Sequence, residues 1–132
     1  TLQALPLLLS QFLLIKFQSL LKVKTKLKKD IMYIVIYEFK VKENCDHKFI
    51  DSWKILTNLI QKYEGSLGSR LHKQKDLHYM AYAQWPSKEI FEDLGKKLPE
   101  SASEIKKKMK DSCKEIKTLH YLEVIEDLLK KN

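Results

Sequence analysis

Apolar and polar residues alternate along residues 32–42, which read MYIVIYEFKVK. One face of this stretch carries Tyr33, Val35, Tyr37, Phe39 and Val41. Its enrichment in β-branched and aromatic residues predicts a strand rather than a helix. Because Ile34 and Ile36 occupy the opposite face, we expect the first half of this strand to be covered on both sides.

The pattern then changes to helical spacing over residues 45–63. Apolar residues recur at steps of three and four, which puts them on one face of a helix: Phe49, Trp53, Leu56, Ile60 and Tyr63. Asn44 or Asp46 is expected to cap the beginning of this helix. Gly65 is expected to end it.

Two strands, two helices and a last strand are expected after Gly65. The runs 67–73 and 77–85 flank a polar turn and predict a hairpin. Ser87 is expected to cap a helix that reaches Leu94 and stops before Gly95. The Ser101-x-x-Glu104 pattern predicts a capping box, followed by a helical stripe of Ile105, Met109, Cys113 and Ile116. Alternation over residues 118–128 predicts the fourth strand.

The expected order is that of the ferredoxin-like βαββαβ arrangement in the α+β class. It predicts a four-stranded antiparallel sheet with the helices on one face. Strands one, three and four nevertheless have apolar residues on both faces; in the third, Met80 and Tyr82 alternate with Tyr79, Ala81 and Ala83. An apolar sheet face without helices indicates an interface, so we expect a homodimer formed sheet against sheet.

The hairpin register decides whether two histidines meet. A two-residue turn sets Leu71 opposite His78, whereas a three-residue turn sets Leu71 opposite Tyr79 and His72 opposite His78. The hydrophobic pattern favours the second register. Two facing histidines still fall short of the three protein ligands usual in a catalytic zinc site, and no metal site is predicted.

Composition fits one folded domain and excludes several functional classes. The chain has 132 residues, 44% of them hydrophobic, and a net charge of +8. Residues 1–31 carry +5 of this charge, and the +3 that remains does not indicate nucleic-acid binding. Cys45 and Cys113 lack metal-binding spacing and are expected to be reduced, in a cytoplasmic protein. The sequence contains no phosphate-binding loop, dinucleotide fingerprint, nucleophile elbow or HExxH motif.

Residues 1–31 are treated as an appendage to a domain of residues 32–132. The segment is Leu-rich and then Lys-rich, and its charges follow the apolar part, unlike those of a signal peptide. Polar residues interrupt the apolar run, so a membrane-spanning helix is not expected. Three interpretations stay open: an amphipathic helix, a divergent anchor, or sequence upstream of a natural start at Met32. We favour the last, or a poorly ordered appendage.

Residues 32–128 resemble the antibiotic biosynthesis monooxygenase domain of the dimeric α+β barrel superfamily. The resemblance rests on MYIVIYEFKVKEN, a helix with Trp53, EGSLGSRLHK, YMAYAQWPSKEIFED with Trp85, and the final LHYLEVIEDL. It implies a small homodimer with a pocket between each sheet and its helices. Family members include cofactor-independent monooxygenases for phenolic or quinol-type aromatics, and haem-degrading enzymes.

The haem-degrading members use an Asn on the first strand and a His on the helix that follows the Trp. This chain has no Asn before Asn44 and no His within 87–117, so haem degradation is not predicted. The cofactor-independent oxygenases use an Asn, a Trp and an Arg. Trp85 and Arg70, the only arginine, match two of these residues, and no bound cofactor is predicted.

The candidate catalytic residues are Trp85, Arg70 and His120, and the candidate substrate-binding residues are Tyr37, Trp53, Tyr79, Tyr82 and Trp85. Each has a structural alternative: packing for the aromatic residues, a half-buried partnered side chain for His120, and a solvent-exposed charge for Arg70. The predicted function is cofactor-independent monooxygenation of a small aromatic or quinol-type substrate. The alternative is a non-catalytic small-molecule-binding or interaction module on the same fold.

Overall fold

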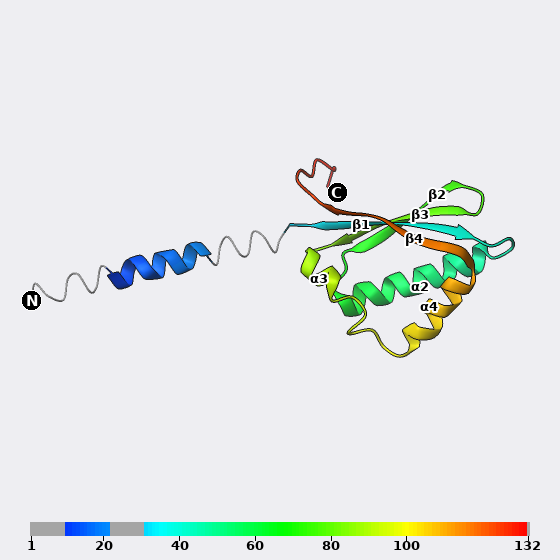
Figure 1. Ribbon diagram of the computed structural model, residues 1–132, viewed down its shortest axis with the longest axis horizontal. Helices are drawn as coiled ribbons and strands as arrows, with labels where there is room; N and C mark the ends of the chain where they lie inside the picture. Colours follow the sequence, from blue (N-terminus) through cyan, green and yellow to red (C-terminus); the bar gives the residue numbers. More distant parts are fainter. Residues whose placement is uncertain (1–9, 22–30, 132) are drawn as a thin grey trace, which may run out of the picture. The chain divides into compact units, whose positions relative to one another are not determined.

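The computed structural model describes residues 10–21 and 31–131, and the chain divides into two compact units, Thr1–Asp30 and Ile31–Asn132 (Figure 1). In the first unit, residues 10–21 form a helix whose side chains are all exposed. The rest of the predicted appendage, apart from Ile31, lies outside the described residues. No helix in the described part of the chain is both long and apolar enough to cross a membrane.

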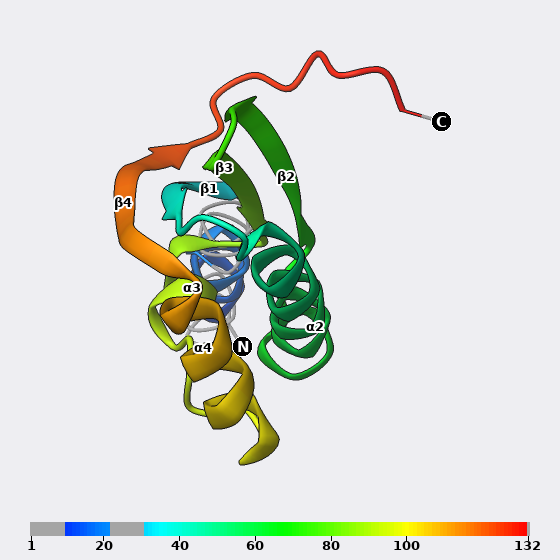
Figure 2. The ribbon, with the colours of Figure 1, turned by 90° about the vertical axis from the view of Figure 1, so that its right-hand side faces the viewer.

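The second unit has the predicted ferredoxin-like α+β fold. Its antiparallel sheet has four strands in the order β2-β3-β1-β4. The helices α2 and α4 lie on one face of this sheet (Figures 1 and 2). The elements are β1 (Tyr33–Val41), α2 (Asp46–Glu64), β2 (Gly68–Lys75), β3 (His78–Trp85), α3 (Lys88–Glu92), α4 (Ser101–Asp111) and β4 (Cys113–Glu123).

The core lies between the sheet and these helices. Burial alternates along β3, where Tyr79, Ala81, Ala83 and Trp85 are buried and the residues between them are half-buried. One cluster joins Phe39 and Val41 of β1 to Phe49 of α2, and a second joins Tyr33 and Val35 to Trp85. The face of the strands formed by every second residue thus packs against the apolar stripe of α2.

Two predicted helix boundaries are confirmed, and two predicted caps are wrong. Gly65 ends α2 in the left-handed conformation, with φ of 77°, and the Ser87 hydroxyl accepts a hydrogen bond from the Ile90 amide. No side chain caps α2, which begins after Cys45. The capping box at Ser101 does not form, because Glu100 is already helical. There the Ala102 and Ser103 amides donate to the carbonyls three residues earlier.

The predicted end of α4 and the predicted range of β4 need correction. The helix ends at Asp111, where the Ser112 hydroxyl donates to the carbonyls of Lys108 and Met109. Cys113 and Ile116, which were predicted to lie on the stripe of this helix, therefore belong to β4. β4 stops at Glu123, because β1 offers no partner beyond Tyr33, and the Val124 amide donates to the Met32 carbonyl.

The predicted hairpin register is wrong by two residues. Leu71 lies opposite Ala81 and His72 opposite Met80, while His78 lies opposite Lys75 after a bulge. Alternation could not detect this error, since a two-residue slip leaves every side chain on the same face. The turn closes at Leu77, which has φ of 64°. The two histidines are therefore not cross-strand partners, and the described residues contain no cluster of three or more metal-ligating side chains.

None of the described helices of the second unit lies on the other face of the sheet (Figure 2). Ile36, Met80 and Tyr82 are half-buried on this open face, and Leu122 is 47% exposed. The expected apolar residues on both faces are therefore present in the fold.

Candidate functional site

A cavity of about 310 Å³ lies between the sheet and the helices α2 and α4, and we call it the internal pocket. Its walls are mainly apolar and come from β1, α2, β3 and α4, as the family resemblance implied. The lining residues are Tyr37, Phe39, Trp53, Leu56, Thr57, Ile60, Ser66, Ser69, Ala83, Trp85, Leu94, Lys106, Met109, Lys110 and Ile116.

Three of the predicted substrate-binding residues meet in this pocket. Tyr37 comes from the middle of β1, Trp53 from the buried stripe of α2, and Trp85 from the last position of β3. The Trp85 ring meets the Phe91 ring edge-on, with 5.5 Å between their centroids. Phe91 of α3 also contacts Tyr33, so the short helix fixes the Trp85 end of the pocket.

The indole N–H of Trp85 is a buried donor without a partner in the described structure. Trp85 is 2% exposed, so solvent does not satisfy this N–H group. A buried polar group left unpaired costs about 1–3 kcal/mol, and such groups are rare in native proteins. A hydrogen-bond acceptor on a ligand would remove this cost.

Tyr37 is a second hydrogen-bonding group in the pocket. Burial, with a smaller contribution from Tyr121, raises the pKa of the Tyr37 phenol from 10.0 to about 12. The phenol therefore keeps its proton across the physiological range and is available as a donor.

Burial likewise raises the pKa of the Cys113 thiol to about 11, so this cysteine is not an activated nucleophile.

A buried carboxylate holds the wall that contains Leu94. Glu64 is 5% exposed, and its Oε1 accepts hydrogen bonds from the backbone amides of Gly95, at 3.1 Å, and Lys97, at 2.8 Å. These bonds tie the segment after α3 to the end of α2. The position of Leu94 in the pocket wall therefore depends on Glu64.

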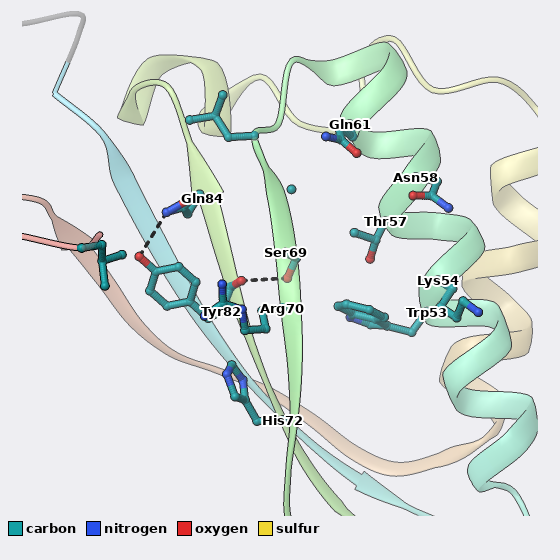
Figure 3. Close-up of a pocket in the computed structure, with 13 residues that line it drawn as sticks. Trp53, Lys54, Thr57, Asn58, Gln61, Ser69, Arg70, His72, Tyr82 and Gln84 are labelled. Atoms are coloured by element: carbon teal, nitrogen blue, oxygen red, sulfur yellow. Dashed lines mark hydrogen bonds between the residues drawn. The ribbon is translucent and has the colours of Figure 1, made fainter. Parts of the chain in front are cut away.

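A larger and more open cavity of about 640 Å³, the edge groove, adjoins the internal pocket at the β2 edge (Figure 3). The two cavities share Trp53, Thr57 and Ser69. Beyond these residues most of the side chains that line the groove are polar: Lys54, Asn58, Gln61, Arg70, His72, Tyr82 and Gln84, with Leu67 and Leu129 as apolar members.

Hydrogen bonds organise the β2–β3 side of this groove. The Ser69 hydroxyl donates to the Tyr82 carbonyl at 3.0 Å, and the Gln84 amide donates to the Tyr82 hydroxyl at 3.4 Å (Figure 3). Arg70 lies opposite Tyr82 in the ladder, which brings these two candidates together. Arg70 and Trp85 therefore line different cavities.

The remaining candidates line neither cavity. Tyr79 is buried in the core, with its ring centroid 5.3 Å from that of Phe49. His120 is exposed on β4, opposite Ile36, rather than half-buried. Their functional roles stay predictions without support from this geometry.

Sequence reasoning missed two charged residues of the internal pocket, Lys106 and Lys110. These lysines directly follow Ile105 and Met109 of the predicted stripe. Had the buried face of the helix been taken to include the positions next to Ile105 and Met109, it would have included both lysines.

Comparison with known proteins finds a family that part of the chain matches. Residues 32–94 match the family model described as antibiotic biosynthesis monooxygenase. No curated protein matches the chain at a significant level.

Solved structures share the fold at low sequence identity. SnoaB, a cofactor-independent oxygenase from Streptomyces nogalater, is 13% identical with a TM-score of 0.60, covering 76% of this chain and 99% of its own. A putative antibiotic biosynthesis monooxygenase from Caulobacter crescentus is 18% identical with a TM-score of 0.61, covering 76% and 96%. A possible oxidoreductase from Bacteroides thetaiotaomicron is 18% identical with a TM-score of 0.59, covering 72% and 99%. The family match over residues 32–94 and the shared fold agree with the βαββαβ order: this part of the chain matches the antibiotic biosynthesis monooxygenase family, and the whole second unit has the fold of these solved structures.

Proposed function

We propose that this domain is a cofactor-independent monooxygenase that oxidises a small phenolic or quinol-type aromatic compound in the internal pocket. The observation that carries the proposal is that Trp85, whose indole N–H is buried and unpartnered, lines the mainly apolar internal pocket. SnoaB, which has the same fold, is a cofactor-independent oxygenase, and this supports the choice of chemistry.

Binding would use the shape and the donors of the pocket. The walls from Leu56, Ile60 and Leu94 suit a flat apolar ring. The Trp85 N–H and the protonated Tyr37 phenol would donate to oxygen atoms of that ring. Both donors stabilise negative charge on these oxygens, and a phenolate or enolate is the electron-rich form that reacts with O₂.

The proposed reaction balances without an added reductant. For an anthrone, the ring CH₂ becomes C=O: one oxygen atom of O₂ enters the product, and the other leaves as water with the two hydrogens. The substrate supplies all four electrons that O₂ takes up. The residues of the chain bind and orient the substrate and exclude water, while the oxidant is O₂ itself.

A non-catalytic binding module is the second candidate function. It is favoured by the absence of Asp, Glu and His among the described residues that line the internal pocket, since these are the usual general bases. On this alternative, the same aromatic compound binds and is released unchanged.

We also propose that the protein is a homodimer formed through the open face. Ile36, Met80 and Tyr82 form the apolar middle of this face, and Leu122 on β4 extends it. A second copy would cover these residues and remove an exposed apolar surface.

Cys45 and Cys113 are free, which agrees with a reducing, cytoplasmic location.

Oxygen uptake tests the function directly. Anthrone and substituted hydroquinones would be supplied in turn, and products would be identified by mass spectrometry. We expect the wild type to consume O₂ with at least one substrate, and Tyr37→Phe and Trp85→Phe to lower the rate about tenfold or more. Tyr63→Phe, on the exposed side of α2, is the matched control and should not change the rate.

Arg70→Ala separates the two cavities. A reaction in the internal pocket is expected to tolerate this change, because Arg70 lines only the edge groove. If Arg70→Ala abolishes oxygen uptake while Tyr37→Phe and Trp85→Phe do not, the reaction does not take place in the internal pocket. Binding of the aromatic compound without any oxygen uptake favours the non-catalytic module.

A further inference from the structure

We infer that the internal pocket selects aromatic ligands that carry a negative charge, and that Lys106 and Lys110 of α4 recognise that charge. This inference rests on the proposed use of the internal pocket and adds a ligand class to it. The expected ligand is an aromatic ring with a carboxylate or sulfonate substituent.

The first observation is the charge of the pocket lining. Lys106 and Lys110 both line the cavity, and the described lining residues include no Asp or Glu. The cavity thus has two cationic side chains and no anionic one. An anion that enters it gains attraction from both lysines without repulsion from a carboxylate of the wall.

The second observation is that neither lysine has an ion-pair partner among the described residues. Among the described residues, no carboxylate lies within 4.0 Å of Lys106 or Lys110, although Lys88, Lys96 and Lys117 all form such pairs. The two acidic residues of α4, Glu104 and Asp111, do not line the cavity. Both ammonium groups are therefore available to a ligand.

The third observation is their spacing. Lys106 and Lys110 are four residues apart on one helix, so they lie on the same face and repel each other. An anion placed between them relieves this repulsion. Lys106 is also half-buried, which makes its charge less screened than that of a fully exposed lysine.

The apolar and charged parts of the pocket come from different elements. Leu56, Ile60 and Leu94 supply apolar wall from α2 and the segment after α3, whereas both lysines come from α4. A ligand that satisfies both parts has an apolar ring and an anionic substituent. The donors Tyr37 and Trp85 then remain for the ring oxygens.

The test compares two probes on the full chain by equilibrium dialysis: 2-naphthol, which is neutral at pH 7, and naphthalene-2-sulfonate. Two lysines near a partly screened anion favour the sulfonate by about tenfold. We expect Lys106→Met/Lys110→Met to remove this preference while 2-naphthol binds as before. We expect added salt to weaken the preference in the wild type.

The double variant Lys107→Met/Lys108→Met is the matched control. It removes the same charge from the same helix at two exposed positions that do not line the cavity. The preference should survive in this control. Equal binding of both probes to the wild type, or an equal loss of preference in both double variants, overturns the inference while the pocket stands as an aromatic site. If neither probe binds the wild type, the inference fails together with the proposed binding site.

Discussion

Removing the Glu64 carboxylate should destabilise the domain and loosen the wall of the internal pocket. Glu64 is almost fully buried, and its Oε1 accepts hydrogen bonds from two backbone amides of the segment after α3. Glu64→Ala leaves the amides of Gly95 and Lys97 without their acceptor. The neighbouring residue Leu94 lines the pocket, so stability and ligand binding should weaken together.

The size of the effect follows from these two bonds. A hydrogen bond to a charged group contributes about 1.5–3 kcal/mol. Both bonds end on one oxygen and are not independent, so we expect a loss of about 2–4 kcal/mol in the free energy of unfolding. For a domain of this size, that loss lowers Tm by roughly 10–20 °C. Glu64→Gln keeps an acceptor oxygen without the charge, and we expect about half of this loss.

Urea unfolding followed by circular dichroism measures the difference. Glu92→Ala is the control, because Glu92 is exposed on α3 and its only ion pair, with Lys88, is 3.8 Å long. An exposed pair of this kind contributes about 0–1 kcal/mol. If the free energy of unfolding of Glu64→Ala lies within about 0.5 kcal/mol of the wild-type value, the carboxylate does not hold this segment in place.

Three further predictions concern single residues. In an alkaline titration followed at 295 nm, one tyrosine should ionise near pH 12, and this ionisation step should be absent from Tyr37→Phe. Because folding raises the pKa of Tyr37, its contribution to stability is complete below pH 10 and is lost as pH rises from 10 to 12. A titration in which every tyrosine ionises near pH 10 contradicts the burial of Tyr37. Gly65→Ala should lower the free energy of unfolding by about 1 kcal/mol because φ is 77°, and an unchanged value in urea unfolding argues against this conformation. Ile36→Glu should turn a dimer into a monomer in sedimentation experiments, and a wild type that is already monomeric contradicts the proposed interface.

The sequence predicted the elements whose apolar periodicity is long. The stripe of α2 and the alternation of β1 and β3 each extend over several repeats, so their type and order were clear. The helix stop at Gly65 was also predictable, because the left-handed conformation there strongly favours glycine.

The wrong predictions concern segments whose hydrophobic pattern fits two different structures equally well. A two-residue slip of the hairpin keeps Leu71 on the same face, so alternation could not distinguish Ala81 from Tyr79 as its partner. Cys113 suits a helix stripe and a strand equally well. Cys113 is in a strand because it pairs with Val41 of β1, and this pairing depends on tertiary structure. The Ser112 hydroxyl, which donates to two carbonyls of the last helical turn, marks the end of α4 locally.

The candidate site was partly predictable for a similar reason. Tyr37 and Trp85, on the covered side of the sheet, and Trp53, on the apolar stripe of the helix that covers it, were found because large aromatic residues there must face either the core or a cavity. The charge of the pocket was missed, since the lysines of α4 resemble a solvated face until the helix is docked on the sheet. Glu64 was also missed, because its partners are backbone amides more than 30 residues away.

On the proposed function, Trp85 donates a hydrogen bond to an aromatic ligand in the internal pocket. The chain has two tryptophans, so a ¹⁵N–¹H spectrum has two indole N–H signals, and Trp85→Phe identifies the one from Trp85. On titration with 1,4-naphthoquinone, whose carbonyl oxygens are acceptors, we predict a saturable downfield shift of this signal as the unpartnered donor gains its acceptor. A Trp85 signal that stays in place while the side-chain amides of Asn58 and Gln84 shift would put the ligand in the edge groove and exclude Trp85 as its hydrogen-bond donor.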